Sequence, residues 1–133
     1  MTIETIFLGE SYTEATHLAS KSTINTDAPV DNKGKGSAFS PTDLLAASLG
    51  SCMLTIMGFY AEEHQLNIVN TKLSILKIMT ANPRRVSEIQ ITFDLPKNNF
   101  SEKDKISLER VAKNCPVAKS LHPDLVQTLV FNW

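Results

Sequence analysis

The sequence predicts an α+β fold in which antiparallel sheet packs on one long, buried central helix. An uncharged stretch of eighteen residues, 44–61, has helical character, alternating β-branched segments lie on both sides of it, and a shorter amphipathic segment follows them. At 133 residues, with 42% hydrophobic and 20% charged residues, the chain fits one domain spanning residues 1–133. It needs no disulfide to fold.

The N-terminal part predicts a short hairpin followed by a loop. Residues 3–8 are apolar in partial alternation, and Gly9 and Glu10 separate them from a second expected strand at residues 12–16; this pattern is typical of two antiparallel strands. Residues 21–39 are polar and rich in turn-forming side chains. We expect this segment to be a loop.

Ser40 and Pro41 predict the start of the long helix, because serine is a preferred cap and proline fits the first helical position. Asp43 lies three residues past the cap, the place of a capping-box partner. We expect the helix to end near Glu63. Its expected inward stripe consists of Leu45, Leu49, Cys52, Ile56 and Phe59.

The C-terminal part predicts a hairpin, a second helix and a last strand. Residues 67–80 and 84–95 alternate and are rich in β-branched side chains, as in a long hairpin. A serine-capped helix follows, and Cys115 should lie on its apolar stripe. Pro116 should end that helix or start another, and residues 124–133 predict the final strand.

Charge and composition exclude some partners and set the compartment. The chain has 13 basic and 14 acidic residues and a formal net charge of -1, so it has no electrostatic surface for nucleic acid. The N-terminus carries an acid where a signal peptide has bases, and polar residues interrupt the apolar helix. We therefore expect a cytoplasmic protein with no membrane partner, in which cysteines are free thiols or a working redox pair.

The candidate chemistry lies in Cys52 and Cys115, which have 62 residues between them and form no C-x-x-C motif. A pocketed thiolate can attack the O–O bond of a peroxide, and a nearby thiol can trap the resulting sulfenic acid. A buried cysteine can equally be an inert small hydrophobe. The histidines have no ligand spacing, so we predict no metal and no cofactor.

Residues 40–52 read Ser-Pro-Thr-Asp-Leu-Leu-Ala-Ala-Ser-Leu-Gly-Ser-Cys, and residues 114–120 read Asn-Cys-Pro-Val-Ala-Lys-Ser. Together, and in this order, they resemble the OsmC/Ohr family of bacterial hydroperoxide-detoxifying proteins. The polar loop at residues 27–32 and the hairpin at residues 83–86 are more similar to the OsmC-like branch than to the Ohr branch. The resemblance spans nearly the whole chain.

This resemblance implies an intertwined homodimer with two active sites near the interface. It implies that Cys52 is the peroxidatic cysteine and Cys115 the resolving cysteine, and that a dithiol, dihydrolipoyl groups among them, reduces the resulting disulfide. The expected activity is that of a thiol-dependent peroxidase, an antioxidant enzyme of the oxidative stress response that reduces organic hydroperoxides.

The chain departs from the best-known members of the family in the charges that hold the thiolate. Those members have an N-terminal arginine and a glutamate before the helix, whereas this chain has no arginine before Arg84. The place of the glutamate falls on Thr42, and its neighbour Asp43 is nine residues before Cys52, roughly opposite on a straight helix.

Asp43 and Arg84 are therefore candidate site residues with other roles open to them. Asp43 already has a capping role, and Arg84 fits a solvated hairpin end equally well. A positive charge near the sulfur would favour the thiolate. The departures leave open an alternative function, a non-enzymatic stress-response protein that holds a hydrophobic ligand on the same fold.

Overall fold

The structure, a computed structural model, describes residues 1–133, the whole chain. The chain divides into two compact units, Met1–Leu45 and Ala46–Trp133. Each unit contains one three-stranded sheet, and the long helix, two further α-helices and a short 3-10 helix at Val30–Asn32 complete the fold. The predicted α+β class is confirmed.

The first unit, called the N-terminal unit below, is a meander of β1 (Ile3–Gly9), β2 (Tyr12–His17) and β3 (Thr23–Thr26). Both pairings are antiparallel, as the hairpin pattern predicted for the first two strands. The third strand lies inside the predicted loop. The sequence did not indicate this strand, because its residues are polar. Strand pairing uses backbone N–H and C=O groups, which every non-proline residue carries, so a polar segment can also pair.

The long helix α1 (Pro41–Glu63) has the predicted bounds and the predicted cap. The hydroxyl of Ser40 accepts the amide hydrogen of Asp43 at 3.1 Å, and the Asp43 carboxylate accepts that of Ser40 at 2.8 Å. This reciprocal pair satisfies two amides that a helix start leaves without intrahelical partners.

The buried face of α1 differs from the predicted stripe. Phe59 is 57% exposed. The buried residues are Ala46, Leu49, Gly50, Met53, Met57 and Ala61. A methyl group placed on Gly50 would come within 2.6 Å of the Ile75 side chain. Small residues on this face therefore let the sheet approach α1 closely. The predicted stripe was wrong because it was chosen by the largest apolar side chains of the helix.

The second unit, called the C-terminal unit below, contains β4 (Lys72–Thr80), β5 (Arg85–Asp94) and β6 (Val126–Asn132), with β5 in the middle. The first two strands form the predicted antiparallel hairpin. The expectation of a wholly antiparallel sheet is corrected here, because β6 pairs with β5 in parallel. Parallel pairing requires a crossover connection, which the helices between β5 and β6 supply.

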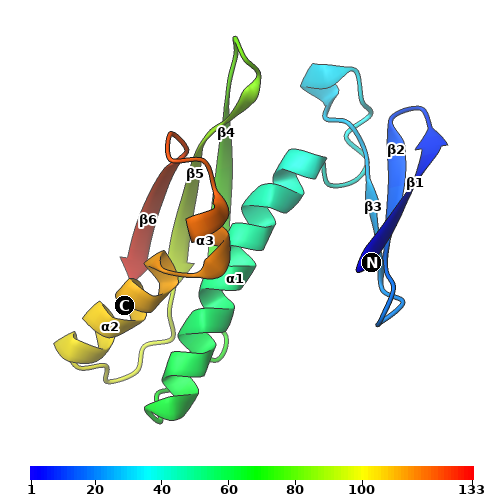
Figure 1. The fold of residues 1–133 in the computed structure, drawn as a ribbon. Helices are drawn as coiled ribbons and strands as arrows, with labels where there is room; N and C mark the ends of the chain where they lie inside the picture. The colour runs from blue at the N-terminus through cyan, green and yellow to red at the C-terminus, as the bar shows by residue number, and fades with distance from the viewer. The chain divides into compact units, whose positions relative to one another are not determined.

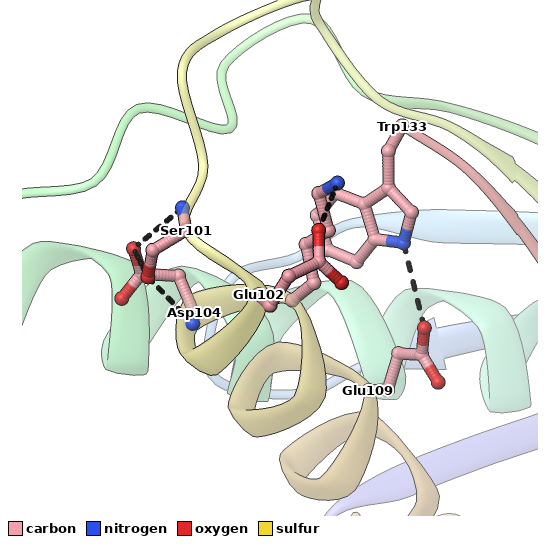
Figure 2. Close-up of polar contacts among 6 residues, drawn as sticks. Ser101, Glu102, Asp104, Glu109 and Trp133 are labelled. Atoms are coloured by element: carbon pink, nitrogen blue, oxygen red, sulfur yellow. Dashed lines mark hydrogen bonds and ion pairs between the residues drawn. The ribbon is translucent and has the colours of Figure 1, made fainter.

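Two short helices form that crossover, α2 (Glu102–Lys113) and α3 (Pro116–Ser120). Figure 2 shows the capping box of Ser101 and Asp104 at the start of α2. It also shows the C-terminal Trp133 donating its indole N–H to Glu109 at 3.4 Å. Cys115 does not belong to the stripe of α2, which ends two residues before it, but is the N-cap of α3.

The helices cover one face of the β4–β6 sheet (Figure 1). The central strand β5 turns Ile89, Ile91 and Phe93 toward this face, and all three are fully buried. Phe93 stacks on Phe131 of β6 with ring centroids 4.3 Å apart. The core of the C-terminal unit therefore lies between its sheet and its helices.

By length and composition, α1 is the one helix that could cross a membrane. Of its most apolar window, 33% is buried within the chain. Such a helix is weak evidence for a membrane span, since core helices of soluble proteins share these properties.

Candidate functional site

Cys52 lies in the middle of α1, at the side of the helix and away from the closest contact with the sheet. It is half-buried, whereas its neighbour Met53 is fully buried against the core. An α-helix holds its backbone rigidly on both sides of this position. Cys52 is therefore fixed in direction and still reachable from outside the chain.

Cys115 is fully buried at the junction between α2 and α3. As N-cap of α3, its sulfur accepts the amide hydrogen of Ala118 at 3.4 Å. Pro116 follows at the first helical position, where its missing N–H is no loss. The sequence Cys-Pro therefore starts a helix and aims its backbone amides at the sulfur.

The structure brings the two cysteines together. Both are free thiols, and Cys52 lies close enough to Cys115 to raise the pKa of its thiol. The two residues are far apart in the sequence and come from different elements, Cys52 from α1 and Cys115 from the N-cap of α3.

Burial raises the pKa of the Cys115 thiol, and the neighbouring Cys52 sulfur raises it further. The amides of Ala118 and Val117 act in the opposite direction, since they donate hydrogen bonds to the sulfur and so favour its charged form. Cys115 therefore keeps its proton more readily than an exposed thiol, and it is out of reach of an external substrate.

The other two predicted site residues lie elsewhere. Asp43 is half-buried and holds the cap of α1. Arg84 is exposed in the turn that joins β4 to β5.

The structure holds no cluster of three or more His, Cys, Asp or Glu side chains that could bind a metal ion. Prediction from the sequence missed the amides of Val117 and Ala118, which contact the buried sulfur. Backbone groups have no side-chain signature, so only Pro116, which starts α3, could have indicated them.

Comparison with known proteins gives one family match and close structural relatives. A family model described as OsmC-like protein matches residues 34–129. A crystal structure from Psychrobacter arcticus 273-4, named provisionally as an osmotic stress induced and detoxification response protein, is 46% identical with a TM-score of 0.95. That match covers 99% of this chain and 96% of that one.

Two further structures share the fold at low identity. An OsmC-like protein from Mycoplasma pneumoniae is 20% identical with a TM-score of 0.81, covering 98% of this chain and 94% of that one. An organic hydroperoxide resistance protein OsmC from Legionella pneumophila is 14% identical with a TM-score of 0.78, covering 100% and 98%. No curated protein matches the chain.

Proposed function

The chain belongs to the family of OsmC-like proteins, and we propose that it acts in stress detoxification by reducing organic hydroperoxides with its two thiols. The observation that carries this proposal is the contact between Cys52 and the buried Cys115. The substrate class is supported by the name of the Legionella pneumophila structure. The chemistry is supported by the thiols themselves.

In the first step, the Cys52 thiolate attacks the terminal oxygen of the hydroperoxide. An S–O bond forms, the O–O bond breaks, and the alkoxide leaves as an alcohol after taking up a proton. Cys52 is assigned this role because it is half-buried and reachable, whereas Cys115 is fully enclosed. The result is a sulfenic acid on Cys52.

In the second step, the Cys115 sulfur attacks the Cys52 sulfenic acid. The S–S bond forms, the S–O bond breaks, and the oxygen leaves as water with the proton from Cys115. The raised pKa of Cys115 suits a thiol that waits for its partner to be oxidised. A dithiol, for which a dihydrolipoyl group is our candidate, then reduces the disulfide and completes the cycle.

An apolar hydroperoxide is the favoured substrate. One turn along α1 from Cys52, Ile56 is half-buried, and Phe59 at the end of the same row is exposed. These side chains offer an apolar surface to the organic part of the substrate. Hydrogen peroxide has no apolar part and would gain nothing from it.

We keep Arg84 and Asp43 in supporting roles within this proposal. Arg84 is our candidate cation for the thiolate, and Asp43 would act through the cap that fixes the start of α1. Replacing Arg84 with glutamine removes the charge and keeps a polar side chain of similar length. If Arg84 activates Cys52, this change slows the oxidation of Cys52 and leaves disulfide closure unchanged.

We further propose that the chain works as a homodimer in the cytoplasm. Four large apolar side chains of β1 are more than half exposed: Ile3, Ile6, Phe7 and Leu8. Such an area of apolar surface is unusual for a monomer and is typical of a surface that another chain covers. Sedimentation equilibrium measures the state directly, and a monomer at all concentrations would contradict this part of the proposal.

The test of the activity is to treat the reduced protein with cumene hydroperoxide and to count free thiols. We expect both thiols to be lost in step with conversion of the hydroperoxide to its alcohol, and peptide mapping to find a Cys52–Cys115 link. A matched portion of reduced protein without peroxide controls for oxidation by air. Thiols that survive a large excess of peroxide would favour the ligand-binding alternative instead.

A further inference from the structure

One polar side chain interrupts the apolar face that β6 turns toward the helices. The strand register places Gln127 opposite Ile89, followed on the same face by Leu129 and Phe131. Gln127 is half-buried there. A polar group at such a position is costly unless it has a hydrogen-bonding partner.

The partner of Gln127 is the backbone of α3. Its side-chain amide donates a hydrogen bond to the carbonyl oxygen of Ala118 at 3.2 Å. A helix as short as α3 leaves its last carbonyl groups without intrahelical partners. Gln127 satisfies one of them and so ties α3 to the sheet.

The same peptide segment contacts the buried thiol from its other side. Ala118 accepts from Gln127 through its carbonyl oxygen and donates through its N–H to the sulfur of Cys115. That sulfur in turn lies within reach of Cys52. A continuous path of contacts therefore runs from the sheet to the thiol pair.

We propose that Gln127 is a positioning residue for disulfide closure, the second step of the proposed function on which this inference rests. In that step Cys115 loses its proton, its sulfur forms the S–S bond with Cys52, and the sulfenic oxygen leaves as water. Negative charge develops on a sulfur in a dry environment, where the amide of Ala118 is the nearest donor. Gln127 keeps that donor in place.

The substitution Gln127→Met tests this role, because methionine has nearly the shape of glutamine and no donor. We expect peroxide to oxidise Cys52 at an unchanged rate, since Gln127 contacts neither substrate nor Cys52. Closure of the disulfide should slow by about 5- to 10-fold, the effect of one hydrogen bond. Stopped-flow with a sulfenic-acid trap separates the two rates.

The matched control is Gln90→Met. Gln90 is also half-buried on the same sheet, but it lies on the face opposite to that of Gln127. There its side-chain amide donates to the carboxylate of Glu88 at 3.0 Å. It should leave both rates unchanged. Equal slowing of closure in the two variants would show a general weakening of the sheet and overturn the assignment to Gln127.

A second readout needs no peroxide and so does not depend on the proposed activity. In a Cys52→Ser background, the ultraviolet absorbance of the thiolate reports the titration of Cys115 alone, with the variant lacking both cysteines as baseline. Gln127→Met should raise the pKa of Cys115, by up to about one pH unit, because the amide donors lose their alignment. Gln90→Met should not change it.

The outcomes are distinct. If Gln127→Met raises the pKa of Cys115 but the natural protein does not react with peroxide, Gln127 still aligns the amides and the proposed peroxidase activity is wrong. If Gln127→Met leaves the pKa of Cys115 unchanged or lowers it, and the disulfide closes at the normal rate, the role of Gln127 is wrong and the proposed peroxidase activity is unaffected. Gln127→Glu gives a further check, since a carboxylate cannot donate to the carbonyl oxygen of Ala118 and also brings a negative charge toward the thiols, so it should slow closure at least as much as Gln127→Met.

Discussion

The two units of the chain are stabilised in different ways. Every fully buried hydrophobic side chain belongs to the C-terminal unit, Ala46–Trp133, which also contains both cysteines. The buried residues of the N-terminal unit, Met1–Leu45, are Thr26, Asp27 and Ser40, all polar. The C-terminal unit has a core of its own, whereas the N-terminal unit has a hydrogen-bonded centre and exposed apolar strands.

The polar centre of the N-terminal unit is built around Asp27. Its carboxylate accepts the amide and the hydroxyl of Ser37, at 3.0 and 2.9 Å, and Ser37 also contacts the hydroxyl of Tyr12. The backbone amide of Asp27 bonds to the carbonyl of Phe39 at 3.1 Å. These bonds order the loop that leads into α1. Hydrogen bonds therefore order the N-terminal unit, and its apolar side chains stay exposed.

The largest effect is expected where the C-terminal unit carries the chemistry. Cys52→Ser should abolish consumption of hydroperoxide, because no other thiol is reachable. Cys115→Ser should fold well, since serine is a good N-cap, and it should leave a sulfenic acid on Cys52 after one turnover. Mass spectrometry after dimedone labelling detects that species. Similar activity in the two variants would contradict the assigned roles.

The next largest effect is on stability, and it distinguishes the buried core of the C-terminal unit from the exposed apolar side chains of the N-terminal unit. Leu49→Ala removes a fully buried side chain from the C-terminal core and should cost about 2–5 kcal/mol of unfolding free energy. Ile6→Ala, at a 58% exposed position of β1, should lower stability only at protein concentrations where the chain associates. Urea unfolding at two concentrations measures both. A concentration-independent loss in Ile6→Ala would mean that the N-terminal unit has a core after all.

Two glycines give a smaller and more specific contrast. In Gly34→Ala the new methyl group would clash with the backbone oxygen of Ala28, which cannot move aside as a flexible side chain can, so we expect a loss of about 1–3 kcal/mol. In Gly50→Ala it meets the flexible ends of Ile75 and Leu73, and the gain in helix propensity, about 1 kcal/mol, offsets the strain. Thermal unfolding should rank Gly34→Ala well below Gly50→Ala. The reverse order would contradict the close approach of Gly34 to the backbone of Ala28.

The smallest effect is a pH dependence of the N-terminal unit. The amide of Ser37 lowers the pKa of Asp27, although burial acts against this. A lowered pKa in the folded state stabilises the fold at neutral pH, and this contribution is lost as the pH falls from the ordinary pKa of an aspartate through the lower folded-state pKa. Asp27→Asn should therefore be less stable than the natural chain at neutral pH, with a smaller difference in acid. A difference that does not vary with pH would contradict this role.

Local sequence signals determined much of the fold. Ser40, Pro41 and Asp43 predicted the start of α1 correctly, and Ser101 with Asp104 did the same for α2. Such signals work because a cap satisfies backbone groups within a few residues, with no reference to the rest of the chain. The cysteine motifs pointed to the family in the same local way.

The tertiary structure decided what depends on contacts between distant residues. It placed β6 parallel to β5, selected the small-residue face of α1 for the sheet, and moved Cys115 from a helical stripe to the cap of α3. It also set Gln127 against α3, which the alternation of β6 did not indicate. The physical reason is that a motif specifies which thiols are present, whereas their shared environment depends on how the crossover between β5 and β6 packs on α1.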